Sequence, residues 1–116
     1  GEKLGVDAQC IFVEADSMSE FEANIEQLDG DLWLSCTAPL KHSPQARLGV
    51  DGPEGVNAIN QLKRKDGIWS GTSTDGVGFV AACRHIGIEP NGSTLRMRGG
   101  GSAARAIAAA WAAEGG

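Results

Sequence analysis

The apolar positions in the first third of the chain predict a strand, a helix and a second strand. Residues 5–15 have a continuous apolar centre, which is typical of a buried strand. Residues 18–28 carry apolar side chains at helical spacing, Ser17 and Glu20 form a capping box at their start, and Gly30 marks their end. A short apolar run at 32–36 predicts the second strand. This order is typical of a parallel βαβ unit whose strand ends face a ligand crevice, so the expected fold class is α/β.

The middle of the chain alternates loops with a predicted hairpin. Residues 41–50 are expected to form a short helix followed by a loop, which glycines and a proline extend to residue 55. Residues 56–62 and 67–71 are strand-like, and the sequence Lys-Arg-Lys-Asp-Gly between them ends in the Asp-Gly pair of a β-hairpin. We expect its three basic side chains to lie in a solvated turn.

The last third predicts two helices with a strand between them. Asp75 opens a helix that ends at Gly87, and four of its apolar residues share one face: Phe79, Val80, Cys83 and Ile86. A turn at 89–92 leads to a short strand at 93–98, a glycine loop at 99–101 and an alanine-rich helix. One strand and one helix are half of a repeat, which needs neighbours to cover both faces.

Composition and charge narrow the classes of protein. The 116 residues allow one domain or a part of two, and 41% hydrophobic with 22% charged residues is ordinary globular composition. The net charge of −5 disfavours nucleic acid and anionic membranes as partners. No apolar stretch is long enough to cross a bilayer and no leader opens the chain, so we expect a soluble, cytoplasmic protein.

Cysteine and histidine usage gives no sign of a metal site. The three cysteines are odd in number and none belongs to a Cys-x-x-Cys pair, so we expect them to be reduced and mostly buried. The two histidines, His42 and His85, are far apart in the sequence. We therefore predict that the protein binds no metal.

Two short stretches carry residues suited to proton transfer. The first runs from Ser35 to Lys41, and its Pro39 favours an extended chain that can direct Thr37 and Lys41 into one crevice. The second delivers Asp75 at the start of a helix. A lysine and an aspartate that converge on one hydroxyl group form a plausible proton-transfer pair. The alternative for each is ordinary: an exposed lysine, and an aspartate that caps its helix.

Together these stretches resemble the shikimate and quinate dehydrogenase family, whose motifs read Asn-Val-Thr-x-Pro-x-Lys, Ala-Val-Asn-Thr and Asn-Thr-Asp-Gly. The resemblance covers nearly the whole chain. Three ordered segments of the sequence match: Thr37, Pro39 and Lys41; Ala58, Ile59 and Asn60; and Thr74, Asp75 and Gly76 with Gly78 and Phe79.

The resemblance implies a site for a small polyhydroxy carboxylic acid. Lys41 and Asp75 would be catalytic and assist proton transfer at the hydroxyl that is oxidised, while Ser35, Thr37, Asn60 and Asp75 would bind the substrate. Ser35 stands where the motif has asparagine, so it offers one hydroxyl in place of an amide. The family's Ser-x-Ser-Pro segment, which grips the substrate carboxylate, would lie before Gly1.

The glycine loop implies a cofactor. Gly99, Gly101 and Ala104 meet the dinucleotide fingerprint, and the loop resembles that of the family. By resemblance NADP would contact Gly99, Gly100, Gly101, Ser102 and Ala103. Arg96 and Arg98 predict a half-exposed strand, however, and Gly116 comes before the next strand and the loop that would bind the adenosine ribose.

Three hypotheses therefore remain open at the level of sequence. The chain is a partial form of an NADP-dependent shikimate dehydrogenase, or a non-catalytic module that binds a hydroxy acid, or an oligomeric remnant in which another copy covers the terminal strand and helix. The expected domains are 1–75 for the substrate, without its N-terminal strand, 76–92 as a linking helix and turn, and 93–116 as the incomplete start of a dinucleotide-binding domain. Shikimate, quinate and other acids remain alternatives, as do NAD and NADP.

Overall fold

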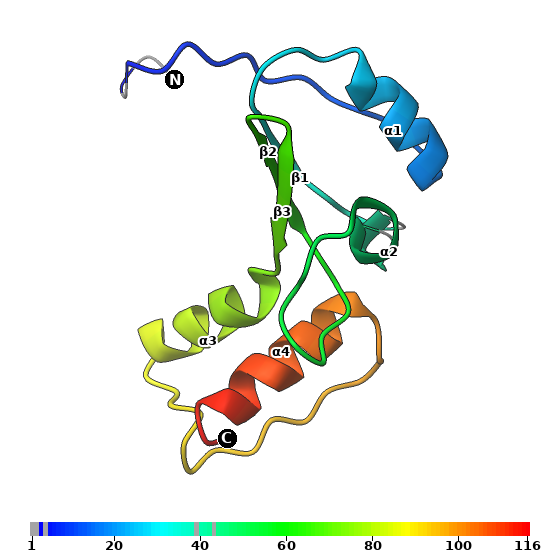
Figure 1. Cartoon of the computed structure of the whole chain (residues 1–116). Helices are drawn as coiled ribbons and strands as arrows, with labels where there is room; N and C mark the ends of the chain where they lie inside the picture. The colour runs from blue at the N-terminus through cyan, green and yellow to red at the C-terminus, as the bar shows by residue number, and fades with distance from the viewer. Residues whose placement is uncertain (1–2, 4, 39, 43) are drawn as a thin grey trace.

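A computed structural model describes residues 3, 5–38, 40–42 and 44–116 (Figure 1). Helices α1 and α2 lie to one side of the three-stranded sheet, and α3 and α4 lie beyond one end of it (Figure 1). The elements in chain order are α1 (Met18–Glu26), β1 (Leu32–Ser35), the 3-10 helix η2 (Leu40–His42), α2 (Pro44–Leu48), β2 (Gln61–Lys65), β3 (Ile68–Thr72), α3 (Asp75–His85) and α4 (Ser102–Ala113).

The sheet is antiparallel throughout, so the predicted parallel βαβ unit is wrong. β2 lies between β1 and β3, and Leu34 of β1 faces Leu62 of β2, which in turn faces Gly71. Residues 5–15 form no strand, because this run has no ladder with any described strand; Phe12 is 89% exposed. The α/β class is retained, since helices still cover a sheet.

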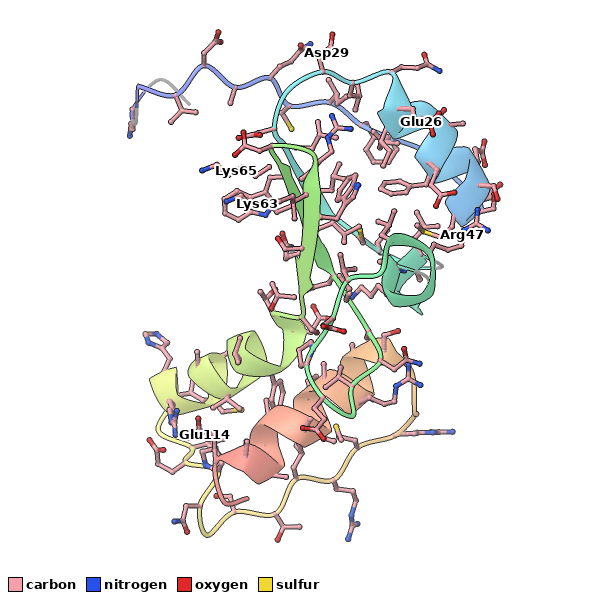
Figure 2. The ribbon with its side chains drawn as sticks, viewed as in Figure 1. Glu26, Asp29, Arg47, Lys63, Lys65 and Glu114 are labelled. Carbon is pink, nitrogen blue, oxygen red and sulfur yellow. The ribbon has the colours of Figure 1, made fainter. Side chains whose placement is uncertain are left out.

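The larger core lies between α1, α2 and one face of the sheet. It is made by seven buried residues: Met18, Phe21, Ile25, Cys36, Val50, Ile59 and Leu62. The start of α1 follows the predicted cap, since the Ser17 hydroxyl accepts a hydrogen bond from the Glu20 amide at 3.2 Å. The helix ends at Glu26 with Gln27 as its C-cap, three residues before the predicted glycine. Arg47 of α2 ties the two helices together through Glu22 at 2.7 Å (Figure 2).

The hairpin is confirmed, but its basic residues do not lie in the turn. Asp66 and Gly67 form the turn with positive φ angles of 50° and 78°, as a two-residue I′ turn requires. Because side chains alternate along a strand, Arg64 of β2 lies on the same face of the sheet as the buried Leu62. This face is turned toward the end of α1, where the last carbonyl groups of the helix have no partner within it. Its guanidinium donates to the carbonyls of Leu28 and Gly30 and lies 5.7 Å from the Trp69 ring centroid. The solvated-turn prediction is therefore wrong for Arg64.

Helices α3 and α4 run in the same direction and are in close contact (Figure 1). Gly76 allows this approach, because a Cβ atom at that position would lie 2.2 Å from the Ala106 carbonyl oxygen. Phe79 and Trp111 pack with ring centroids 6.1 Å apart. The predicted apolar face of α3 is only partly correct, since Ile86 is 69% exposed.

Residues 93–98 form no strand, although the helix predicted after them is present as α4. Arg96, Met97 and Arg98 are exposed, and this segment has no ladder with the described strands. A lone strand cannot pair its backbone groups, which is the physical reason for the failed prediction.

Other expectations concern cysteines, metals and membranes. Only Cys36 is buried, while Cys10 is exposed and Cys83 intermediate, so the expectation that the cysteines are mostly buried is wrong. In the part of the chain that the structure describes, no group of three or more His, Cys, Asp or Glu side chains could hold a metal ion. Within the same described ranges, no helix is both long and apolar enough to cross a bilayer.

Candidate functional site

An ion pair between Lys41 and Asp75 is the centre of the candidate site. The Lys41 Nζ atom lies 2.7 Å from Asp75 Oδ2, and the two side chains are 19% and 24% exposed. Lys41 comes from η2 after β1, and Asp75 is the first residue of α3 after β3. The Ile59 amide donates to the Lys41 carbonyl at 2.8 Å, which holds η2 against the chain that enters β2. Two residues 34 positions apart are thus brought together by the sheet.

Asn60 fixes the aspartate from the other side. This residue is 7% exposed, and its Nδ2 atom donates to Asp75 Oδ1 at 2.7 Å and to Thr74 Oγ1 at 3.0 Å. Its Oδ1 atom accepts from the Thr74 amide at 2.8 Å. The Asn60 backbone, just before β2, is held by both neighbouring segments: its carbonyl accepts from the Cys36 amide at 2.7 Å and its amide donates to the Thr72 carbonyl at 3.1 Å. Both oxygens of the Asp75 carboxylate are therefore held by a defined donor.

Thr74 is a further residue of this cluster, for which the sequence predicts no role. The backbone N–H of Thr74 donates to Asn60 Oδ1, and the Thr74 hydroxyl accepts from Asn60 Nδ2. A buried side-chain amide such as that of Asn60 needs partners of both kinds. The sequence feature that points to Thr74 is its position directly before Asp75 in the third motif.

The arrangement differs from the ordinary alternatives for the two charged residues. Lys41 is half-buried and paired, and the Asp75 carboxylate bonds to side chains from two other segments. A hydroxyl group placed against this pair could accept a hydrogen bond from the ammonium and donate one to the carboxylate. Such a geometry suits proton transfer.

The charge of Lys41 also acts on a neighbouring thiol. Burial raises the pKa of Cys36, and the positive charge of Lys41 partly opposes this rise. The thiol therefore remains protonated and unreactive at neutral pH, which makes Cys36 a core residue of this region rather than a nucleophile.

Two predicted substrate residues lie at the end of β1. Ser35 is exposed, and its Oγ atom accepts from Gln61 Nε2 at 3.2 Å. Thr37 is exposed, and its carbonyl accepts from the Leu40 amide at 2.9 Å. The structure therefore brings Lys41, Asn60 and Asp75 into direct contact and leaves Ser35 and Thr37 at the border of this cluster.

The glycine loop offers only part of a cofactor site. Gly99, Gly100 and Gly101 are exposed, and no side chain caps α4 at Gly101, so the amides at the start of this helix suit a pyrophosphate. Ser102 and Ala103 begin the helix. Residues 93–98, however, form no strand to support the loop. The described residues therefore fit only the pyrophosphate part of a dinucleotide.

The fold and the ion pair define an α/β domain with a partly buried lysine–aspartate pair at the end of a sheet. None of the family sequence models matches the chain. The NADP(+) shikimate dehydrogenase of Xanthomonas campestris pv. campestris (strain B100) is 35% identical over 121 residues, which covers 95% of this chain. The chain is therefore homologous to the shikimate dehydrogenase family over most of its own length.

Two solved structures are similar to the chain in both sequence and fold. The shikimate 5-dehydrogenase of Listeria monocytogenes, in complex with shikimate and NAD, is 30% identical with a TM-score of 0.61 over 72% of this chain and 29% of its own. The ligand-free 5-ketofructose reductase of Gluconobacter sp. strain CHM43 is 28% identical with a TM-score of 0.73 over 98% of this chain and 42% of its own. The chain spans about two fifths, 40%, of the curated relative from Xanthomonas.

Proposed function

We propose that this chain carries the polyhydroxy-acid site of a shikimate dehydrogenase, the class of enzyme that interconverts shikimate and 3-dehydroshikimate with NADP. The observation that carries this proposal is the Lys41–Asp75 pair at 2.7 Å, which Asn60 orients from the opposite side. The bound shikimate of the Listeria relative supports the class of ligand.

In this proposal the reacting hydroxyl lies between Lys41 and Asp75. On oxidation the hydroxyl proton moves to this pair, and on reduction it returns from it. Asn60 binds the substrate and keeps the Asp75 carboxylate in position, while Ser35 and Thr37 bind further hydroxyl groups. A side chain fixed in this way loses less entropy when the ligand arrives.

The proposed domain division follows from the same relation. Residues 1–75 form the substrate domain, 76–92 a linking helix and turn, and 93–116 the start of a dinucleotide-binding domain. NADP, when bound to a complete enzyme, would accept the hydride, and residues 99–103 would meet its pyrophosphate. The uncapped start of α4 supports this assignment.

A second candidate is a module that binds the hydroxy acid without hydride transfer. It is favoured by residues 93–98, which form no strand beneath the glycine loop. The two candidates share the Lys41–Asp75 site and differ only in cofactor chemistry.

Calorimetric titration with shikimate tests the shared site. We expect saturable binding of shikimate. Lys41→Ala and Asp75→Asn should each weaken the affinity at least about tenfold, because each change removes a charge-assisted hydrogen bond. Lys63→Ala is the matched control: it also removes one lysine, but from a side chain that projects from β2 away from α1 (Figure 2).

Absorbance of the reduced nicotinamide separates the two candidates. Turnover of NADP with shikimate, abolished by Lys41→Ala, would favour the dehydrogenase for this chain, and binding without turnover would favour the module. Equal affinity in Lys41→Ala, Asp75→Asn and Lys63→Ala would contradict both.

A further inference from the structure

Two departures from the family motifs meet across the sheet. Ser35 stands where the first motif has asparagine, and Gln61 stands where the second has threonine. These two residues are direct cross-strand partners of β1 and β2. Side chains in such a position lie on the same face and within reach of each other. An amide group absent from β1 is thus present on the neighbouring strand.

A chain of hydrogen bonds gives this amide one orientation. Trp33 Nε1 donates to Gln61 Oε1 at 3.0 Å, and Gln61 Nε2 donates to Ser35 Oγ at 3.2 Å. An indole nitrogen is a donor only, so it selects the oxygen of the amide and turns the nitrogen toward Ser35. Because the Ser35 oxygen accepts this bond, its own O–H remains available to donate to another acceptor.

The chain of bonds lies at the same end of the sheet as the proposed substrate site. Gln61 follows Asn60 directly, and the Cys36 amide next to Ser35 donates to the Asn60 carbonyl at 2.7 Å. Trp33 is 79% exposed, so burial of its ring contributes little to the fold. Its indole is nevertheless held by Gln61, which agrees with a role in orienting polar groups.

We propose that Gln61 determines substrate specificity: held by Trp33, it directs the Ser35 hydroxyl toward one hydroxyl of the bound polyhydroxy acid. Gln61 and Trp33 are positioning residues, and Ser35 is the group that touches the ligand. This inference rests on the proposed function of the Lys41–Asp75 site.

A double-mutant cycle, read out as the affinity for shikimate, tests whether Gln61 acts through Ser35. The single changes Gln61→Thr and Ser35→Asn each introduce the residue of the family motif, and the double variant introduces both. We expect Gln61→Thr to weaken binding about fivefold, the effect of one hydrogen bond, and the double variant to regain affinity within about twofold of the original chain. Additive effects of the two changes would overturn the inference.

The indole signals in a nitrogen–proton spectrum give a second readout. Shikimate should shift the Trp33 indole N–H through Gln61 and leave the Trp111 indole in α4 unchanged. In Gln61→Met, which keeps the side-chain length without the amide, the Trp33 shift should disappear. A Trp33 signal that does not respond in the original chain, despite binding, would contradict the inference.

The two proposals can fail separately. If Lys41→Ala abolishes shikimate binding while Gln61→Thr leaves the affinity unchanged, the proposed function is supported and the role of Gln61 is contradicted. If the unchanged chain binds no shikimate by calorimetry, both fall.

Discussion

Asn60 is the residue that joins the sheet to the candidate site. Its backbone bonds to Cys36 and Thr72 at the end of the sheet, and its side chain bonds to Thr74 and Asp75. A buried amide of this kind is stabilising only while all its partners are present.

We therefore expect Asn60→Ala to lower the free energy of unfolding by about 2–3 kcal/mol, since it leaves the Thr74 amide and the Asp75 carboxylate without their buried partner. Urea denaturation measures this change. The matched control is Asn91→Ala at an exposed position, which should change stability by less than about 0.5 kcal/mol. Equal effects of the two substitutions would contradict the role of Asn60.

At the scale of elements, the contact between α3 and α4 depends on one glycine. Gly76 faces the Ala106 carbonyl and the Ala110 Cβ, so a methyl group there would push the helices apart. Gly78, two residues further on the same helix, has open space at its Cβ position. Helix packing therefore requires a glycine at position 76 but not at position 78.

Gly76→Ala should destabilise the protein by about 1–3 kcal/mol, because the clash is with backbone that cannot rotate away. Gly78→Ala should instead stabilise it by about 0.5–1 kcal/mol, because alanine favours the helix over the unfolded chain. Thermal unfolding of both variants by circular dichroism gives the comparison. A loss of stability in Gly78→Ala as large as that in Gly76→Ala would show that helix packing is not the cause.

Sequence patterns predicted those elements whose signals are local. The Ser17 cap, the Asp66–Gly67 turn and the alanine-rich α4 each depend on neighbours within a few residues, and each is present. The strands predicted at 5–15 and 93–98 are absent, because a strand needs a partner from elsewhere in the chain. Local propensity alone does not supply that partner.

At the scale of the whole molecule, two hydrophobic clusters differ greatly in size. The larger one lies under α1 and α2 and includes Ile59 and Leu62, while the smaller one consists of Val56, Ala58 and Ala106. Small clusters bury less apolar surface and open at lower free energy.

Hydrogen exchange should therefore show two levels of protection. Amides of β2 should exchange only on global unfolding, and amides of α3 and α4 should exchange faster through local opening. Leu62→Ala, at a position 1% exposed, should lower the protection of β2 by about 2–5 kcal/mol. Uniform protection across β2, α3 and α4 would contradict the two-level behaviour.

The sequence by itself determined the Ser17 cap and the hairpin turn, and it supplied the candidate site residues Ser35, Thr37, Lys41, Asn60 and Asp75. These depend on residue type and short spacing, which the chain carries in its order. Only the tertiary structure decided that Lys41 and Asp75 form a 2.7 Å pair oriented by Asn60, that Arg64 lies under a helix end, and that Trp33, Gln61 and Ser35 are linked. The reason is that strand pairing and register set such distances, and both arise from contacts between residues far apart in the chain.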